Sequence, residues 1–260
     1  HKRLALSLAS TIEWQIATVR SIHVESPRVK LFTLELPVIT PFRAGQHFDV
    51  RLTAPDGYQA QRSYSVSSSP EPASNLTSIE FTVELITDGE VSSYFHEAVE
   101  VGDQIEIRGP IGGHFTWSPI ATKPVMMIAG GSGIAPIMSM IRQRSNTAAI
   151  EKSPMLLIFS ARTEADILFA TELESIAVND TDFHLLVALT RAEEVAPDNR
   201  PFRQFRRIDR PTIESELSNL ATHPSSAYIC GGSSFVEAMA NHLLGIGMPN
   251  NSIRTERFGP

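Results

Sequence analysis

The residues best suited to chemistry lie in the stretch IAGGSGIAPI, residues 128–137, where three glycines and a serine interrupt apolar residues. Gly131 and Gly133 would let backbone N–H groups come close to a ligand, because no Cβ atom intrudes. Apolar residues at helical spacing resume near Ala135, and Pro136 fits the first turn of a helix, where a missing N–H costs nothing. A helix start of this kind attracts anions, so the stretch favours a bound pyrophosphate.

Two other interpretations of this stretch are a turn that binds nothing and a hydrolase active-site turn. The same residues fit a tight strand-to-helix turn that binds nothing, and the stretch alone leaves that interpretation open. A hydrolase nucleophile elbow, G-x-S-x-G, would also place Ser132 among glycines. That motif needs a glycine at position 134, where this chain has Ile134, so the sequence argues against it.

A second group of candidate residues lies in QRSYSVSSSP, residues 61–70. If this stretch is a strand, Arg62 and Tyr64 share one face. Ser63 and Ser65 then share the other face. A guanidinium suits a phosphate, and an aromatic ring beside it suits stacking on a flat cofactor. The segment alone fits an exposed polar edge strand equally well.

A third candidate is GEVSSYF, residues 89–95, where Gly89 and Ser92 would open a short helix. The start of that helix offers a second place for a phosphate. Two anion sites with an aromatic side chain between them favour two nucleotides that meet across a cleft between domains.

The elements expected over residues 12–117 are short strands separated by turns. Their segments are rich in Val, Ile, Thr and Phe and partly alternate between apolar and polar residues. These segments are WQIATVRSI, VKLFTLEL, QHFDVRL, RSYSVSS, SIEFTVELI and DQIEIRG. Only residues 91–99, VSSYFHEAV, have a helical pattern. Short strands at this spacing indicate an antiparallel barrel or sandwich.

From about residue 122 the pattern changes to short apolar strands that alternate with helices. The expected strands are VMMIA, MLLIFS, HLLVAL and AYICG. The expected helices are residues 134–144, EADILFATELESIAV, residues 211–220 and SFVEAMANHLLGIG. This alternation predicts a parallel sheet covered on both faces. We therefore predict two domains, residues 12–117 and 122–260, with residues 118–123 as the link.

Composition argues against several classes of protein. The chain has 260 residues, which allows one or two domains, and its net charge of -7 argues against a general nucleic-acid binder. No apolar run approaches the roughly 20 residues that cross a bilayer, and residues 1–10 make a weak secretory signal. We expect no nucleic-acid partner, no membrane span, and a monomer or weak dimer.

Cysteine and histidine usage narrows the chemistry further. Cys230 is the single cysteine, which excludes an internal disulfide and argues against a Cys-ligated iron–sulfur cluster within this chain. A reducing, cytoplasmic setting is therefore expected. The eight histidines are scattered without a pair at metal-ligand spacing, so we predict no metal site.

The motifs RSYS, GEVSS, GGSGIAP, YICGG and TERFGP, in this order and spacing, resemble the ferredoxin–NADP reductase superfamily. The resemblance covers residues 12–260. It implies an antiparallel, Greek-key flavin-binding barrel followed by an NAD(P)-binding α/β domain. It also implies an NAD(P)H-dependent flavin oxidoreductase, in which hydride passes from NAD(P)H to a bound flavin. Electrons then leave to a separate acceptor, such as ferredoxin, a haem or metal oxidoreductase, or free flavin.

The resemblance assigns roles to residues of the first domain. Arg62 would pair with the flavin pyrophosphate, Tyr64 would lie against the isoalloxazine, and Ser65 would hydrogen-bond near flavin N5. The whole set assigned to the flavin is Arg62, Ser63, Tyr64, Ser65, Gly89, Glu90, Val91 and Ser92. FAD is usual in the family and FMN is the alternative. The loop 71–78 has no aromatic for adenine stacking, and Tyr58 is a possible substitute.

The resemblance also assigns residues of the second domain. Those matched to the nicotinamide dinucleotide are Gly131, Ser132, Gly133, Pro136, Gly231 and Gly232. Cys230 would lie beside the site of hydride transfer, Glu256 would place a carboxylate near the flavin, and Phe258 would cover its ring. Core packing is the alternative for Phe258, and burial at a strand end is the alternative for Cys230.

Three features remain to be placed. Arg162 and Arg191 follow the second and third predicted parallel strands, and they favour a 2′-phosphate and NADPH over NADH, unless both are solvent-facing loop charges. Residues 200–210 hold five arginines, for which we expect a docking patch for an acidic redox partner or a part of the nucleotide site. A solvated surface run and a nucleic-acid surface are the alternatives. For the whole chain, a non-catalytic flavin-binding subunit is the alternative function.

Overall fold

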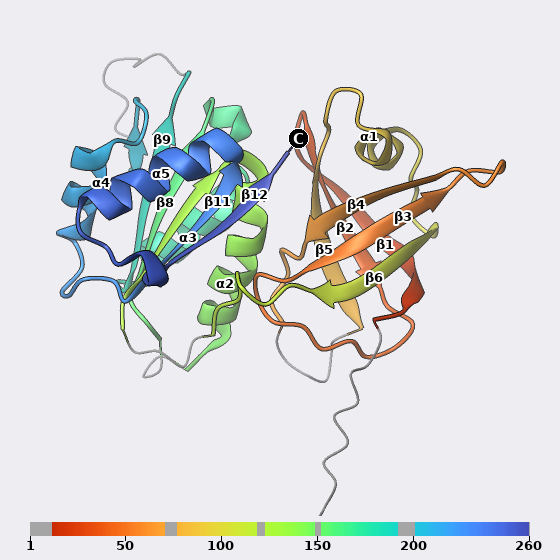
Figure 1. Cartoon of the computed structure of the whole chain (residues 1–260), viewed down its shortest axis with the longest axis horizontal. Coiled ribbons are helices and arrows are strands. Elements are labelled where there is room, and N and C mark those ends of the chain that lie inside the picture. Colours follow the sequence, from red (N-terminus) through yellow and green to blue (C-terminus); the bar gives the residue numbers. More distant parts are fainter. Residues whose placement is uncertain (1–11, 71–76, 119–122, 149–151, 192–200, 260) are drawn as a thin grey trace, which may run out of the picture.

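The computed structural model describes residues 12–70, 77–118, 123–148, 152–191 and 201–259. They form two halves that lie side by side (Figure 1). The first half is an antiparallel sheet and the second is a parallel sheet with helices, in the predicted order. Residues 119–122 of the predicted link lie outside the described residues.

The first half is a six-stranded antiparallel barrel. Its strands are β1 (Trp14–Ser26), β2 (Val29–Glu35), β3 (His47–Thr53), β4 (Gln59–Ser65), β5 (Ser78–Glu84) and β6 (Gln104–Ile111), and its helix is α1 (Glu90–Glu97). The strand order is β4-β3-β6-β1-β2-β5, so β6 returns between two earlier strands, as in a Greek key. A bridge between Val66 and Phe81 joins the two ends of this order and closes the barrel.

Large aromatic side chains fill the barrel and fix its helix. Phe32, Phe48 and Phe81 are completely buried inside it. Phe95 of α1 packs edge-on against Phe32, with ring centroids 4.9 Å apart. Because aromatic pairs of this geometry add to the gain from burial, α1 is held firmly over one end of the barrel.

The second half is a parallel sheet between two layers of helices. Its strands are β7 (Val125–Gly130), β8 (Met155–Ala161), β9 (Phe183–Leu189), β10 (Arg203–Gln204), β11 (Ser226–Gly232) and β12 (Ile253–Phe258). Its helices are α2 (Ile134–Asn146), α3 (Ala170–Asn179), α4 (Arg210–Leu217) and α5 (Ser233–Gly245). The 3-10 turns are Gly131–Gly133, Glu164–Asp166 and Asn250–Ser252. The strand order is β10-β9-β8-β7-β11-β12.

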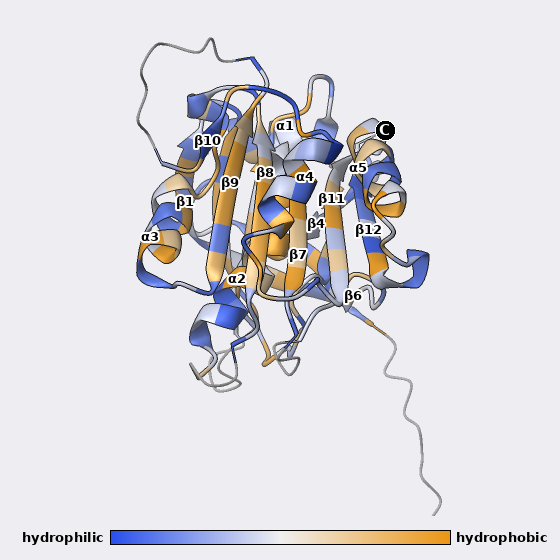
Figure 2. Ribbon diagram, turned by 90° about the vertical axis from the view of Figure 1, so that its left-hand side faces the viewer, coloured by the Kyte–Doolittle hydropathy of each residue, from blue (hydrophilic) through white to orange (hydrophobic). Residues whose placement is uncertain are grey.

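The central strands β7, β8 and β9 are apolar on both faces over most of their length, as Figure 2 shows by their colouring. In β7, Met127 points into the core formed with α2 and α3, whereas Met126 and Ile128 point into the core formed with α4 and α5. A strand buried on both faces needs a continuous apolar run, which is why the predicted strands here were recognisable.

Two strands were not expected from the sequence. β10 is only Arg203–Gln204 at one edge, and β12 is the polar segment IRTERF at the other. The pairing of β12 with β11 sets Cys230 opposite Glu256 and Gly232 opposite Phe258. This register carries the two tail residues to the carboxyl end of the sheet, where ligands bind in folds of this kind.

The two halves are joined by packing and by ion pairs. Phe115 and Trp117, near the end of the predicted first domain, are buried in the core of the second half. The Arg142 guanidinium of α2 donates to Glu80 of the barrel at 2.7 Å and to both oxygens of Glu172 on α3 at 2.7 and 2.8 Å. Within the described residues, no helix is long and apolar enough to cross a membrane.

Candidate functional site

Two neighbouring clefts open where the halves face each other. The barrel cleft, of about 550 Å³, lies between β4, the end of β5 and the start of α1. The sheet cleft, of about 370 Å³, lies at the carboxyl ends of the parallel strands. The residues that line both clefts are Glu84, Ile86, Ser132, Phe258 and Gly259. A molecule bound in one cleft would therefore lie next to a molecule bound in the other.

The strand β4 lines the barrel cleft with its last four residues, Arg62 to Ser65. Arg62 is exposed and bonds the carbonyl of Gln61, and it forms no ion pair within the described part of the chain. The ring of Tyr64 lies 5.7 Å from that of Phe95 and 6.0 Å from that of Phe81. A cation without a counter-ion therefore stands beside a ring that is firmly packed from behind.

The two serines of this motif have protein partners. Ser63 donates to Asp49 at 2.7 Å, and Arg108 donates to the same carboxylate at 2.6 Å. Burial opposes ionisation of Asp49, but the hydrogen bonds from Arg108 and Ser63 prevail and lower its pKa. Ser65 is buried and donates to Glu256 at 3.1 Å, across the boundary between the halves.

The start of α1 forms another part of the barrel cleft. Gly89 is the N-cap residue and no side chain caps the helix, so its first N–H groups are available to an anion. The Ser92 hydroxyl accepts from the Ile86 N–H and donates to the Gly89 carbonyl, both at 3.1 Å. Glu90 accepts a hydrogen bond from Tyr58 at 2.9 Å. The N–H groups of Glu90, Val91 and Ser92, rather than the serine hydroxyl, are thus left for a phosphate.

The glycine-rich turn forms the start of α2 and one wall of the sheet cleft. Gly131 has a φ of +56°, which disfavours a side chain. At Gly133, a Cβ atom would lie 2.3 Å from the carbonyl oxygen of Cys230, so only glycine lets α2 begin this close to β11. The helix begins at Ile134, where the predicted helix 134–144 begins, and Pro136 is buried within its first turn.

The end of β11 forms the floor of the sheet cleft. Gly231 and Gly232 line it together with Phe235, the third residue of α5. A Cβ atom at Gly231 would lie 2.8 Å from the Phe235 ring, and one at Gly130 would lie 2.9 Å from it. Phe235 was not singled out from the sequence, because it belongs to the apolar pattern of α5.

Cys230 and Glu256 lie side by side behind the clefts. The Cys230 thiol is completely buried, and burial together with the neighbouring Glu256 carboxylate raises its pKa well above the ordinary value. Burial also raises the pKa of Glu256 to about 7, although the hydrogen bond from Ser65 opposes the rise. Phe258 is half-buried and lines both clefts.

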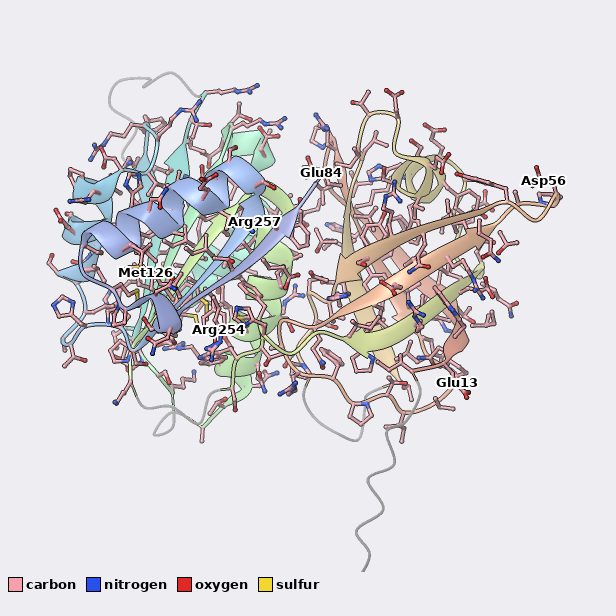
Figure 3. All side chains as sticks on the ribbon, viewed as in Figure 1. Glu13, Asp56, Glu84, Met126, Arg254 and Arg257 are labelled. Atoms are coloured by element: carbon pink, nitrogen blue, oxygen red, sulfur yellow. The ribbon has the colours of Figure 1, made fainter. Side chains whose placement is uncertain are left out.

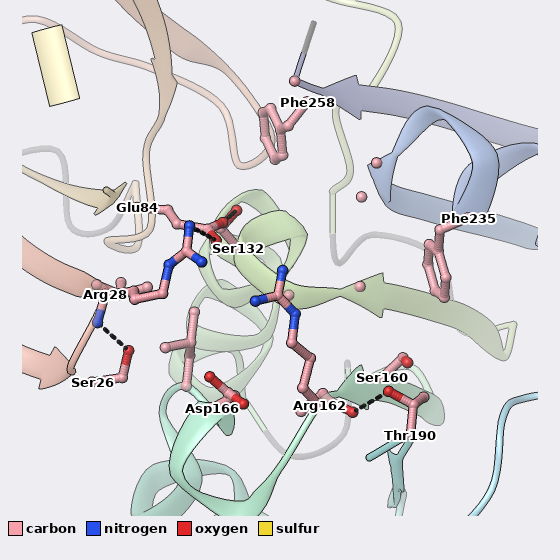
Figure 4. A pocket seen from close by; sticks show the side chains of 18 of the residues that line it. Ser26, Arg28, Glu84, Ser132, Ser160, Arg162, Asp166, Thr190, Phe235 and Phe258 are labelled. Atoms are coloured by element: carbon pink, nitrogen blue, oxygen red, sulfur yellow. Dashed lines mark hydrogen bonds and ion pairs between the residues drawn. The ribbon is translucent and has the colours of Figure 1, made fainter. Parts of the chain in front are cut away.

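The charged residues of the sheet cleft come from both halves. Arg162 is exposed and lines the cleft next to Asp166, whose carboxylate accepts from the Thr163 N–H and hydroxyl at 3.1 and 2.7 Å. Arg191 is exposed, and its backbone N–H bonds the Arg162 carbonyl at 2.8 Å, but its side chain does not line the cleft. Figure 4 shows Arg28 opposite Arg162. The sequence alone does not indicate Arg28, because only the folded structure brings the turn between β1 and β2 to the sheet cleft.

Glu84 is a further residue that the sequence did not indicate. It ends β5, accepts a hydrogen bond from Ser132 at 2.7 Å, and lies 3.9 Å from Arg28 (Figure 4). It stands where the two halves face each other (Figure 3). Its place at the end of a predicted strand that precedes Gly89 is the one feature that could have suggested it.

The described arginines of residues 200–210 differ in how exposed they are. The Arg203 side chain is 3% exposed and forms ion pairs with Glu164 and Glu174, so it cannot dock a partner. Arg206 is exposed and pairs with Asp209 at 3.0 Å. None of the described residues of the run lines the sheet cleft, so the contribution to the nucleotide site gains no support there, and docking through the exposed Arg206 and Arg207 stays a prediction. Residue 200 lies outside the described residues.

Metal ligands do not gather in the part of the chain that the structure describes. No group of three or more His, Cys, Asp or Glu side chains there could hold a metal ion.

Comparisons with known proteins identify both halves. The family model of the oxidoreductase FAD-binding domain matches residues 16–117. The family model of the oxidoreductase NAD-binding domain matches residues 127–241. The fold and these matches define an FAD- and NAD-binding oxidoreductase. This chain belongs to the oxidoreductase family that joins an FAD-binding domain to an NAD-binding domain, and its fold is that of the ferredoxin–NADP reductases.

Two curated relatives and one solved structure illustrate the likeness. The glycine betaine monooxygenase reductase subunit of Chromohalobacter salexigens is 31% identical over 89% of this chain and 60% of its own length. The flavohemoprotein of Rhizobium meliloti is 30% identical over 95% of this chain and 61% of its own. This chain thus spans about 60% of such relatives. The ferredoxin NADP⁺ reductase of Neisseria gonorrhoeae, solved with FAD and NADP, has a TM-score of 0.78, 22% identity, and coverage of 95% of this chain and 99% of its own.

The barrel cleft has the donor set that FAD requires. A flavin dinucleotide needs a cation and backbone N–H groups for its diphosphate, and an apolar surface for its ring. Three features line this one cleft: Arg62, which has no ion-pair partner among the described residues, the uncapped start of α1, and the ring of Tyr64. The residues present therefore fit the cofactor.

Proposed function

We propose that this chain takes electrons from NAD(P)H through FAD and passes them to a separate acceptor protein. The observation that carries the proposal is the wall shared by the two clefts. Phe258, Ser132 and Glu84 line both, which supports the proposal that nucleotides bound in the two clefts would lie against each other. A bound flavin supplies the redox chemistry, since it accepts a hydride equivalent and releases electrons one or two at a time.

The barrel residues hold the cofactor in this proposal. Arg62 and the N–H groups at the start of α1 bind the diphosphate, and Tyr64 supports the ring. Burial raises the pKa of Tyr64 beyond its ordinary range, so its hydroxyl stays neutral and adds no negative charge beside the diphosphate.

In this proposal, Ser65 and Glu256 hold a proton and transfer it. With a pKa raised to about 7, Glu256 is protonated in a large fraction of molecules near neutral pH. Ser65 donates to Glu256 at 3.1 Å, so transfer of the carboxyl proton towards the barrel cleft requires this bond to reverse: the protonated carboxyl donates to the Ser65 oxygen and the Ser65 hydroxyl donates into the cleft. The neighbouring Cys230 thiol stays neutral and serves as a close-packed support for this carboxyl.

The sheet cleft receives the coenzyme. Gly131 and Gly232 leave backbone groups open to its diphosphate, and Phe258 must move aside when the nicotinamide enters. Arg162 is exposed, whereas the carboxylate of Asp166 is already bonded by Thr163. An exposed cation beside an occupied carboxylate favours the 2′-phosphate of NADPH over the bare ribose of NADH.

The acceptor is proposed from the relatives. The Chromohalobacter protein is named as the reductase subunit of a monooxygenase, and another relative as the reductase component of a propane 2-monooxygenase from Mycolicibacterium goodii. We infer that the acceptor of this chain is a metal-containing oxygenase component or a small iron–sulfur protein.

Anaerobic mixing of the FAD-loaded protein with NADPH and, separately, with NADH tests the function. We expect the visible flavin absorbance to bleach, faster with NADPH. If flavin binds but neither nucleotide bleaches it, the chain is a flavin-binding subunit without reductase activity. A protein that takes up no FAD would contradict both functions.

A further inference from the structure

Arg28 brings a positive charge from the barrel into the sheet cleft. It lies in the turn between β1 and β2, and its guanidinium donates to the Leu85 carbonyl at 2.9 Å. Arg28 and Arg162 project toward each other from opposite walls, one from each half of the protein (Figure 4). Two guanidiniums facing across a cleft suit an anion between them.

Glu84 contacts Arg28 and Ser132, and each of these two residues could bind such an anion. One of its oxygens accepts the Ser132 hydroxyl at 2.7 Å, and the other lies 3.9 Å from the Arg28 guanidinium. Ser132 belongs to the turn that begins α2, where the backbone favours a negative charge. The carboxylate of Glu84 thus stands where a phosphate would be attracted.

We propose that Arg28 is a coenzyme-phosphate ligand supplied by the barrel, and that Glu84 is an internal anion that competes with the coenzyme for Arg28 and Ser132. The inference rests on the proposed function, in which the sheet cleft takes NAD(P)H. When the coenzyme binds, its phosphate takes the place of the Glu84 carboxylate as the partner of Arg28 and Ser132. Glu84 therefore weakens coenzyme binding and keeps Arg28 and Ser132 positioned while the cleft is empty.

The proposal predicts opposite effects for two neutralising substitutions. Arg28→Gln removes a phosphate ligand, so NADP⁺ and NAD⁺ should bind on the order of tenfold more weakly, as for a lost charge-assisted hydrogen bond. Glu84→Gln removes the competing charge but keeps an acceptor for Ser132, so both nucleotides should bind several-fold more tightly. Arg28→Lys keeps the charge and should bind nearly as well as the wild type.

The test measures dissociation constants by calorimetry on the full FAD-loaded chain, with inorganic pyrophosphate as a second probe. Pyrophosphate should follow the same order of affinities, because the proposal concerns phosphate rather than nicotinamide. Flavin content and circular dichroism establish that each variant is folded. The matched controls are Arg20→Gln and Glu35→Gln, which neutralise an exposed ion pair of the same barrel outside both clefts and should leave binding unchanged.

The outcomes separate this inference from the proposed function. If the wild type binds nucleotide but Arg28→Gln binds equally well, or if both substitutions change affinity in the same direction, the inference is wrong and the reductase function stands. If the wild type bleaches with neither nucleotide and binds neither, the proposed function fails and the inference fails with it. If Arg20→Gln weakens nucleotide binding as much as Arg28→Gln does, the effect comes from net charge alone and the proposal is wrong.

Discussion

Glu256 is a carboxylic acid in a place that favours its protonated form. It is largely enclosed between β11 and the barrel, its nearest strand neighbour in register is Cys230, and Ser65 donates to it. In the unfolded chain the same group ionises near its ordinary pKa, well below the value of about 7 in the fold. Folding therefore carries a cost that grows as the pH rises from the lower value to the higher one.

We expect Glu256→Gln to raise the free energy of unfolding at pH 8 by up to about 3 kcal/mol, because a neutral amide need not be desolvated as a charge. The gain should shrink as the pH falls and vanish only well below pH 4.5, where the carboxyl is protonated in both states. Urea denaturation at pH 5 and pH 8 measures this. The exposed Glu237→Gln is the control, and an equal gain at both pH values would contradict the explanation.

Single residues also mark where the sequence was informative. The motif residues Arg62, Tyr64 and Ser132 line the two clefts. They could be predicted because glycine, arginine and aromatic residues form recognisable motifs in the sequence. Arg28 and Glu84 could not be found in this way. Their importance comes from facing one another and Arg162 across a boundary between halves, which is a property of tertiary structure alone.

At the scale of elements, the junction of β7, the glycine turn and α2 is the tightest part of the site. The helix starts so close to β11 that the carbonyl of Cys230 occupies the place of a Cβ atom at Gly133. Gly232 is different, because a Cβ atom there would meet nothing within 4 Å and its φ of -64° is ordinary. The two glycines therefore allow a direct comparison.

Gly133→Ala should lower the free energy of unfolding by about 1–3 kcal/mol, as overpacking of a close contact does. Gly232→Ala should change it by less than about 0.5 kcal/mol. Chemical denaturation of both variants measures the difference. Equal effects of the two substitutions would show that α2 can retreat from β11 without loss.

The elements themselves were predictable to the degree that burial imposed a pattern. β7, β8 and β9 are buried on both faces and appear as apolar runs, and α2 to α5 follow helical spacing. β12 was missed because it is an edge strand of half-exposed residues with three charged side chains. The run around Arg203 looked like surface because its partners, Glu164 and Glu174, come from other elements.

For the whole molecule, the site depends on how the halves are held together. Arg142 joins them through Glu80 and the Ser67 carbonyl, while Glu172 holds its other side. Burial opposes its charge, but the two carboxylates prevail and raise its pKa, so it stays ionised at any usual pH. Removing it would leave two carboxylates without their partner.

We expect Arg142→Met to lower the free energy of unfolding by about 2–4 kcal/mol, because breaking a mostly buried ion pair strands the opposite charges. Arg206→Met removes the exposed pair with Asp209 and should cost less than about 1 kcal/mol. Thermal denaturation of both variants, with FAD content as a second measure, provides the comparison. A loss at Arg142 no greater than at Arg206 would mean that apolar packing alone joins the halves.

Two hydroxyl–carboxylate bonds cross the boundary in opposite directions: Ser65 of the barrel donates to Glu256 of the sheet, and Ser132 of the sheet turn donates to Glu84 of the barrel. Each half thus lends one donor and one acceptor to the other. A chimaera that exchanged either half for that of a distant cousin would have to import matching members of both pairs. Otherwise the retained half would keep one carboxylate without its donor and one hydroxyl without its acceptor at the boundary, so an exchange of halves must preserve both pairs.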